Sequence, residues 1–247
     1  MQSLTDNKRI TRVNRDGKRA ATGSEHKSIE YYFEARLDIQ ALIAARGKRI
    51  LDVGCAAGEL GFALKQAGAR EVIGIESSTE AAALAQDKLD RVLVGDAQSP
   101  HWPLAESSFD YIIFADVLEH LVDPWSALAS FSRYLQADGR VVASIPNIRF
   151  YAIIARLIFN AWGYRESGIL DSTHLRFFTL PTIRELFARA GLRIEKIERT
   201  YRLFEDQSRI GRVGAFASRL FCRFVAPMVG RDLFTFQYRI VARKTDD

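Results

Sequence analysis

Residues 50–58 read Ile-Leu-Asp-Val-Gly-Cys-Ala-Ala-Gly, and this stretch decides the fold of the chain. Its apolar start predicts a buried strand, which ends near an acidic residue and breaks into a turn of small residues. Residues 59–64 then continue as a helix. A strand, a turn without bulky side chains and a helix N-terminus form a place where a ligand can lie against bare backbone.

Strands and helices alternate after this turn. Continuous apolar strands, such as Tyr-Ile-Ile-Phe-Ala at 111–115, are typical of a parallel sheet that is covered on both faces. The expected strands are 49–53, 71–75, 91–94, 109–114, 140–145, 192–200 and 236–242, and the expected helices are 59–66, 79–89, 124–135 and 182–190. The sequence therefore predicts an α/β fold with a seven-stranded, mostly parallel sheet and helices on both faces.

Three further segments flank this alternating core. Residues 1–24 are expected to be a flexible basic leader, and the apolar spacing of Ser28–Ala45 predicts an amphipathic helix that Gly47 ends. Residues 25–247 would then form one domain. The segments 148–178 and 201–234 interrupt the pattern near the C-terminus, so we expect them to lie over the strand ends as a helical cap.

The turn at 54–58 excludes two common nucleotide sites. A dinucleotide fingerprint needs glycines at G-x-G-x-x-G, but Ala56 and Glu59 occupy the second and third of those positions. The Gly-Lys-Ser/Thr of a phosphate loop is also missing. The pattern that is present, acidic-x-Gly-x-small-x-Gly, resembles the first motif of class I S-adenosylmethionine-dependent methyltransferases, which implies a Rossmann-like fold.

Three later motifs strengthen this resemblance. The second strand ends at Glu76, which is placed to accept the ribose hydroxyls, and the third is followed by Asp96, which can accept from the adenine amino group. Residues 109–121 are similar to the region that follows the fourth strand in that family. The resemblance implies that S-adenosylmethionine is the cofactor and that its contacts come from Asp52, Gly54, Cys55, Ala56, Gly58, Glu76, Ser77, Asp96, Ala97, Ala115 and Asp116. At Ala56, where the family often has glycine, we expect a negative φ.

Two of the four histidines are candidates for a catalytic base. His120 follows the fourth strand, near the expected methyl group, although capping of the next helix is an equal alternative. His174 lies in Asp-Ser-Thr-His-Leu-Arg-Phe-Phe-Thr at 171–179, which looks like a signature of methyltransferases associated with bacterial glycans and secondary metabolites. The alternative role of this loop is a clamp in which Asp171 pairs with Arg176.

The sequence does not decide what the two cap segments contact. Arg149 and Arg156 share a stripe in the apolar stretch 148–162, and basic residues recur within 210–226. Such helices can lie in a membrane interface, or they can pack on each other or across a homodimer. The first alternative would suit a lipid-linked acceptor and a protein that is peripheral to the inner membrane surface.

Composition narrows the expected location, metal content and partners of the chain. Only two cysteines, without ligand spacing, favour a cytoplasmic chain and predict no metal site. The net charge of +5 comes without a basic, aromatic groove pattern, so no nucleic acid is expected as a partner.

The leading hypothesis is transfer of a methyl group, preferably to oxygen, onto a small-molecule, glycan or lipid-linked acceptor. The alternative is a non-catalytic subunit that binds the cofactor for assembly or regulation.

Overall fold

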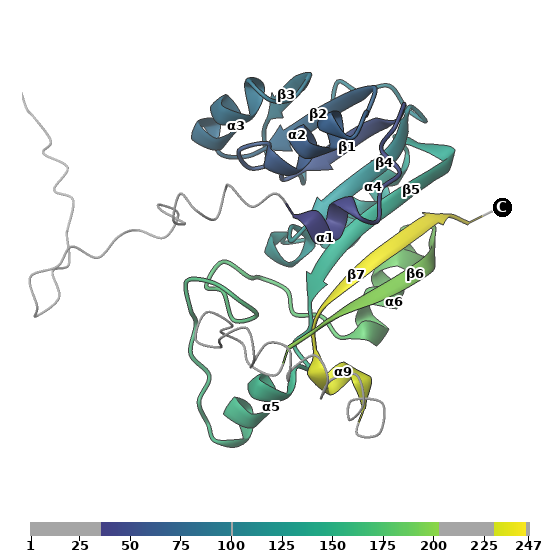
Figure 1. The fold of residues 1–247 in the computed structure, drawn as a ribbon. Coiled ribbons are helices and arrows are strands. Elements are labelled where there is room, and N and C mark those ends of the chain that lie inside the picture. The colour runs from purple at the N-terminus through teal and green to yellow at the C-terminus, as the bar shows by residue number, and fades with distance from the viewer. Residues whose placement is uncertain (1–35, 100, 203–229, 246–247) are drawn as a thin grey trace, which may run out of the picture.

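The computed structural model describes residues 36–99, 101–202 and 230–245, which fold around a single sheet (Figure 1). Its seven strands run in the order β3-β2-β1-β4-β5-β7-β6. The strands are β1 (Arg49–Val53), β2 (Glu71–Glu76), β3 (Arg91–Val94), β4 (Phe109–Ala115), β5 (Leu135–Pro146), β6 (Leu192–Tyr201) and β7 (Thr235–Lys244). All seven predicted strands are present, so the predicted sheet is confirmed.

The direction of the strands places the functional edge. Strands β1 to β5 pair in parallel, and β7 lies antiparallel between β5 and β6. From β1 the chain proceeds outward to β2 and β3 and then returns to β4 on the other side of β1. The strand order therefore reverses between β1 and β4, and ligands of open α/β sheets bind beyond the carboxyl ends of the strands at such a point.

Helices cover both faces of the sheet, as predicted. They are α1 (Leu37–Gln40), α2 (Glu59–Gln66), α3 (Thr79–Gln86), α4 (Pro124–Ser132), α5 (Tyr151–Ile158), α6 (Leu180–Arg189) and α9 (Arg231–Phe234), with a short 3-10 helix η2 (Leu118–His120). Side chains of α1, α2 and α3 share one buried cluster with Ile50 and Val72 of the sheet. Those of α4 and α6 share another with Leu51 and Ile73. Successive strand residues therefore face opposite layers, which is why these strands read as continuously apolar.

The predicted helix Ser28–Ala45 is too long: within the described residues 36–45, only Leu37–Gln40 is helical. Helix α1 has four residues, and the chain then turns at Ala41 and continues without helix to Ala45. Ile39, Ile43 and Ala45 are buried against the same face of the sheet as α2. Packing of these three side chains on the sheet outweighs their helical spacing, because local propensity is a weak prior beside tertiary contacts.

The region after β5 forms a small unit of its own. Helix α5 and residues 163–178 pack together through a third buried cluster formed by Phe150, Ile153, Ile169, Leu170 and Phe236. Helices α5 and α9 lie near the end of β5 and the start of β7 in Figure 1.

Residues 203–229 of the second predicted cap segment, and the predicted leader 1–24, lie outside the described residues. Within the described ranges, no helix is both long enough and apolar enough to span a bilayer.

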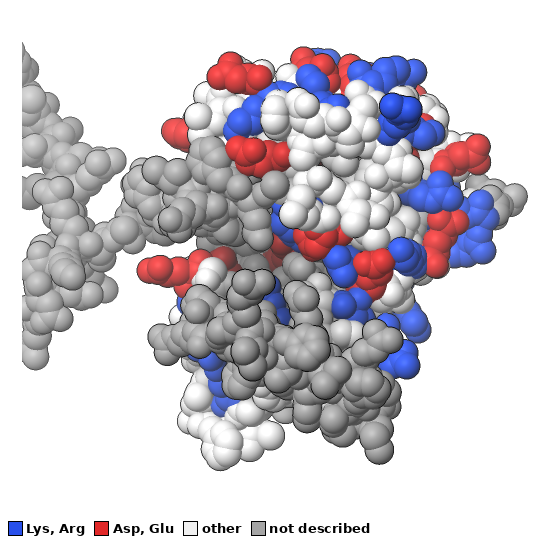
Figure 2. Space-filling model, in the orientation of Figure 1, with Lys and Arg blue, Asp and Glu red and all other residues white. Residues whose placement is uncertain are grey.

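Charged side chains are mixed on the face shown in Figure 2. Lys and Arg residues alternate with Asp and Glu over the described part of that face, and they do not gather there into one basic patch. Several pairs are direct contacts, such as Arg140 with Glu195 at 2.9 Å and Lys65 with Asp90 at 2.8 Å.

Candidate cofactor and acceptor site

Asp52 is the buried acid at the reversal of strand order. It lies in β1 opposite Gly74 of β2 and Ile113 of β4, and its exposed fraction is 1%. Its Oδ2 atom is buried and accepts no hydrogen bond from the residues that the structure describes. Burial, together with the nearby Glu76 carboxylate, raises the pKa of Asp52 to about 7, although the Arg36 guanidinium opposes the shift. A cation bound here would favour the ionised form of this carboxyl group.

The turn after β1 needs glycine for two reasons. Gly54 has a φ of 74°, and a Cβ atom on it would lie 2.5 Å from Cγ2 of Val117. Gly58 has a φ of 82°, and its Cβ would lie 3.1 Å from Ala85. Both positions combine left-handed backbone with close packing, so only glycine fits without strain or displacement of a neighbour.

Ala56 contradicts the prediction made for it. Its φ is 49°, in the left-handed region, and not negative as expected. Such a conformation costs an L-residue about 1–2 kcal/mol. The amide nitrogen of Ala56 donates to Oε2 of Glu76 at 2.9 Å. The flanking glycines and this hydrogen bond hold the residue in place, which accounts for the departure from the preferred backbone region.

Glu76 ties the ends of β1 and β2 together. Its Oε1 accepts from the amide of Ser78 at 2.9 Å and from the Ser77 hydroxyl at 3.3 Å, and its other oxygen holds Ala56. The side chain is 8% exposed. Cys55 is buried beside it, and burial, with the neighbouring carboxylates Asp52 and Glu76, raises the pKa of its thiol. Cys55 therefore stays a thiol and contributes packing.

The predicted adenine side of the site lies at the end of β3. Gly95 follows β3, and the side chain of Asp96 is exposed and accepts from the amide of Gln98 at 2.8 Å. This contact closes a turn and fixes the direction of the carboxylate. Ala97 is half-buried and packs against the apolar cluster under α4. These two residues lie beyond the carboxyl end of β3, next to the end of β2, as expected.

Asp116 is the centre of a network that sequence reasoning did not reveal. Its φ is 57°, and its carboxylate accepts from Arg36, from the Ser144 hydroxyl at 3.0 Å and from Gln237. The Ser144 hydroxyl also accepts from the amide of Asp116 at 3.0 Å. Ala115 precedes it and packs against the cluster under α2. Three polar partners from distant segments thus converge on Asp116, and no local sequence signal could have linked them.

The structure brings the two candidate histidines together. The ring centroids of His120 and His174 are 4.6 Å apart, with the rings 68° from parallel. His120 belongs to η2, directly after β4, while His174 lies in the loop before α6 and is 8% exposed. Oδ1 of Asp171 accepts from both the amide and the hydroxyl of Thr173, at 2.8 and 2.6 Å. Asp171 therefore shapes the turn that presents His174.

Residues 171–178 dock on the turn that follows β4. The amides of Leu175 and Arg176 both donate to the backbone carbonyl of Glu119 at 2.9 Å. The guanidinium of Arg176 donates to the carbonyl of Val122, at 3.0 Å from Nε, and lies over the Trp125 ring at 5.7 Å from its centroid. The loop is thus anchored by Arg176 through the Val122 carbonyl and the Trp125 ring, and not through the expected pairing with Asp171, whose Oδ1 accepts from Thr173.

The residues at this edge fit S-adenosylmethionine. That cofactor has a cationic sulfonium and an ammonium group but no phosphate, so it suits carboxylates and bare backbone rather than a lysine. Asp52 and Glu76 are buried carboxylates, and Oδ2 of Asp52 is a buried acceptor that a donor or cation would satisfy. Gly54 and Gly58 keep the turn free of side chains.

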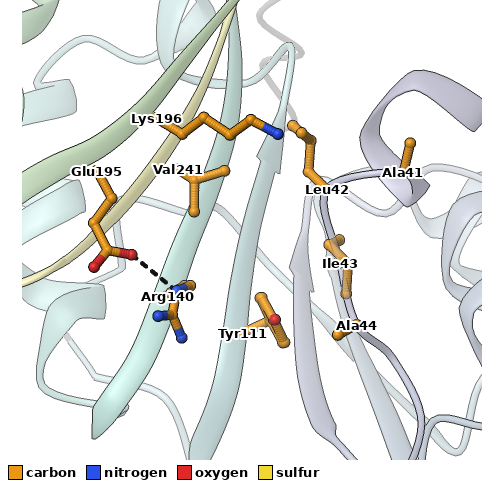
Figure 3. A pocket seen from close by; sticks show the side chains of 9 residues that line it. All are labelled: Ala41, Leu42, Ile43, Ala44, Tyr111, Arg140, Glu195, Lys196 and Val241. Carbon is orange, nitrogen blue, oxygen red and sulfur yellow. Dashed lines mark hydrogen bonds and ion pairs between the residues drawn. The ribbon is translucent and has the colours of Figure 1, made fainter.

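A groove of about 550 Å³ lies elsewhere (Figure 3). Tyr111 and Arg140 line it near the starts of β4 and β5, with Leu42 and Lys196 on its flanks. Arg140 donates to Glu195 along one wall of the groove at 2.9 Å (Figure 3). The groove is therefore at the amino edge of the parallel strands, opposite Asp52 and Glu76, and it is separate from the candidate cofactor site.

Known proteins share this fold and sequence pattern. A family model described as a methyltransferase domain matches residues 25–197. A ubiquinone biosynthesis O-methyltransferase of Aromatoleum aromaticum is 33% identical over 141 residues, which are 54% of this chain and 59% of that protein. A probable S-adenosylmethionine-dependent methyltransferase of Mycobacterium tuberculosis is 26% identical over 175 residues, which are 65% of this chain and 64% of that protein. The chain thus spans less than two thirds of the length of either relative.

A solved structure agrees in fold. The crystal structure of a SAM dependent methyltransferase from Archaeoglobus fulgidus superposes with a TM-score of 0.61 at 22% identity, covering 85% of this chain and 92% of that one. The family model covers well over half of the chain, and the site has the acidic residues and glycine turn that the resemblance implies. The chain therefore belongs to the methyltransferase domain family.

Proposed function

We propose that this chain is an enzyme that transfers a methyl group from S-adenosylmethionine to a hydroxyl oxygen. The observation that carries the proposal is the pairing of His120 and His174, whose ring centroids lie 4.6 Å apart immediately after β4. β4 is one of the two strands between which the strand order reverses. The imidazole pair thus borders the edge at which the acidic cofactor residues gather.

The cofactor would lie along the carboxyl ends of β1, β2 and β3. Asp52 would meet the ammonium side, directly or through water, and Glu76 would accept the ribose hydroxyls with its fixed carboxylate. Asp96 would accept from the adenine amino group, with Ser77 and Ala97 beside it. The turn of Gly54, Cys55, Ala56 and Gly58 would lie against the methionine and ribose, and Ala115 and Asp116 would border the methyl group.

The chemistry follows from this arrangement. When bound, S-adenosylmethionine supplies a methyl group on a cationic sulfur, which an in-line nucleophile can displace. The residues of this chain align the acceptor and handle the proton that its hydroxyl loses as the new carbon–oxygen bond forms. His120 and His174 are the basic groups placed for this task, because a neutral imidazole accepts protons near neutral pH.

Transfer to oxygen has separate support. Residues 115–118 read Ala-Asp-Val-Leu, whereas amino methylases carry an Asn-Pro-Pro-Tyr/Phe type of motif at this place. The relative from Aromatoleum aromaticum is named as an O-methyltransferase. We therefore favour a small-molecule, glycan or lipid-linked acceptor with a hydroxyl group.

The exposed end of α5 favours a lipid-linked acceptor within this set. Ile158 is 74% and Phe159 81% exposed, and Leu157 and Trp162 are exposed beside them, with Arg149 and Arg156 on the same segment. An exposed apolar patch with flanking cations suits the interface of an anionic membrane.

Flotation with anionic vesicles tests this membrane contact, and a matched Ile158→Ser/Phe159→Ser variant serves as control. Protein that stays wholly in the soluble fraction would favour internal packing or a homodimer, which light scattering would reveal.

Turnover decides between the enzyme and a non-catalytic cofactor-binding subunit. The full chain is incubated with methyl-labelled S-adenosylmethionine and fractionated polar, glycan and lipid extracts, and labelled products are identified. We expect a methyl ether, with a large loss of turnover for His174→Ala and none for His101→Ala, since His101 is an exposed residue in the loop before β4. Cofactor binding without any labelled product would support the non-catalytic alternative.

A further inference from the structure

Glu119 joins the two histidines in a compact cluster of ligand-type side chains. One ligand atom from each of Glu119, His120 and His174 lies within 4.8 Å of the others. Glu119 and His120 belong to η2, and His174 comes from the loop that docks on this turn. The cluster therefore exists only because the 171–178 loop folds back on the end of β4.

The hydrogen bonds of His120 determine which ring nitrogen carries its proton. The Thr173 hydroxyl gives its single hydrogen to Asp171 at 2.6 Å, so toward Nδ1 of His120, 3.1 Å away, it can act only as an acceptor. The backbone carbonyl of Thr173, at 3.2 Å, is also only an acceptor. Nδ1 of His120 therefore carries the hydrogen, and the lone pair of the neutral ring lies on Nε2.

The position of the proton on the His174 ring follows from the same argument. Its Nδ1 lies 3.0 Å from the carbonyl oxygen of Ile169, which can only accept, so Nε2 again holds the lone pair. A histidine that binds a metal ion characteristically donates its other ring N–H to a carbonyl or a carboxylate, which fixes the tautomer and the ring orientation. Both histidines of this cluster have that support.

Glu119 adds a carboxyl group that is removed from water. Its exposed fraction is 1%, and its backbone carbonyl accepts from both Leu175 and Arg176 at 2.9 Å. The carboxylate is thus held on a short, anchored turn beside the two imidazoles. A buried carboxylate is costly to desolvate, and a positive charge bound next to it offsets that cost.

We propose that Glu119, His120 and His174 bind a divalent transition-metal ion, with Zn²⁺ as the best match. Two imidazoles and one carboxylate form a donor set that suits zinc, whereas Mg²⁺ and Ca²⁺ prefer oxygen ligands alone. Ligand atoms around a tetrahedral zinc with bonds of about 2.1 Å are about 3.4 Å apart, so the cluster closes modestly around the ion. Three protein ligands also leave one coordination position open, as in catalytic zinc sites.

The open position gives the ion a role in the reaction, and this part rests on the proposed function. An acceptor hydroxyl that binds there becomes more acidic, because the ion stabilises the oxygen anion. The hydroxyl proton leaves to a water molecule at the site. The oxygen then forms its bond to the methyl carbon, and the carbon–sulfur bond breaks with its electron pair remaining on sulfur. In the metal-loaded enzyme this scheme replaces direct proton transfer to the histidines: their Nε2 lone pairs hold the ion, the ion acidifies the acceptor, and water takes the proton.

The test is metal binding by the full chain, measured without cofactor or acceptor. The protein is stripped with a chelator, and Zn²⁺ is titrated against a chromophoric competitor, while Co²⁺ reports the geometry by its visible absorption. We expect one tight site per chain. Loss of a supporting partner alone costs about 10–100-fold in metal affinity, so Glu119→Gln and His174→Ala should each weaken binding by at least about 100-fold, and Thr173→Val by about tenfold. His101→Ala is the matched control and should bind as the unchanged protein does.

Folding and the proposed function are checked separately. Binding of S-adenosylmethionine by each variant shows that its fold is intact, since none of these side chains belongs to the proposed cofactor contacts. The inference is overturned if the unchanged chain binds no Zn²⁺, or if Glu119→Gln and His174→Ala bind it equally well. Either result would leave methyl transfer untouched, whereas an active enzyme whose turnover is unaffected by stripping would remove only the catalytic role of the ion.

Discussion

Replacing Asp52 with asparagine should change how the stability of the cofactor-free protein depends on pH. Burial raises the pKa of Asp52 from its ordinary value of 3.8 to about 7. A carboxyl group whose pKa is raised in the folded state favours folding below pH 4, and this contribution is lost as the pH rises toward 7. The difference between the two pKa values corresponds to about 4 kcal/mol, which is the ceiling for the effect.

Asparagine has nearly the shape of aspartate but cannot ionise. The variant therefore does not lose stability at this position as the pH rises from 4 toward 7. Its own buried amide costs about 1–3 kcal/mol, but that cost is independent of pH. The free energy of unfolding of Asp52→Asn minus that of the unchanged protein should therefore rise by up to about 4 kcal/mol between pH 4 and pH 8. Denaturant unfolding at several pH values measures it.

A control with the opposite sign is available in Asp110. Its pKa is lowered: hydrogen bonds from the Arg49 amide and the Lys48 side chain outweigh the effect of its partial burial. Its ionised form favours folding above its ordinary pKa, and that contribution is lost as the pH falls through the lowered value. Asp110→Asn should thus lose stability relative to the unchanged protein as the pH rises. Parallel stability curves for Asp52→Asn and the unchanged protein would refute the reasoning about Asp52.

Four further substitutions probe the turn and the core. Ala56→Gly should raise the free energy of unfolding by about 1 kcal/mol, because relief of left-handed strain exceeds the entropy that glycine adds to the unfolded chain; Ala57→Gly, at a buried position without positive φ, should lower it. Gly54→Ala should abolish tight cofactor binding in calorimetry, since its Cβ would lie 2.5 Å from Val117. Phe187→Ala, at a fully buried site of α6, should cost about 3–5 kcal/mol in denaturant unfolding. Unchanged values at Gly54 or Phe187 would contradict the packing described here.

Most of the fold could be predicted because its signals are local. The continuous apolar strands and the helix caps identify elements within a few residues, and α2 occupies the predicted range Glu59–Gln66. The helix expected over Ser28–Ala45 could not be judged this way, because Ile39 and Ile43 serve the sheet whether or not the chain is helical. Helical spacing records which side chains are apolar, and it does not record which neighbour buries them.

In the candidate site, too, residues with a local sequence signal could be predicted, and residues that depend on distant contacts could not. Asp52, Glu76 and Asp96 were predictable because each lies at or just beyond the end of a recognisable strand, and parallel strands bring these ends to one edge. Arg36, Ser144 and Gln237 were missed as partners of Asp116, since they come from three separate parts of the chain. Glu119 was visible next to His120, but nothing in its surroundings showed that it would be buried beside His174.

The sequence by itself determined the sheet, the order of the acidic residues and the cofactor that they suit, because strand ends and glycine turns are encoded by adjacent residues. Only the tertiary structure decided the backbone of Ala56 and the meeting of Glu119, His120 and His174. The first depends on a hydrogen bond from the amide of Ala56 to Glu76 of the next strand. The second depends on a loop that docks through the backbone carbonyl of Glu119. Both are contacts between segments distant in sequence, and such contacts leave no periodic or local pattern in the chain.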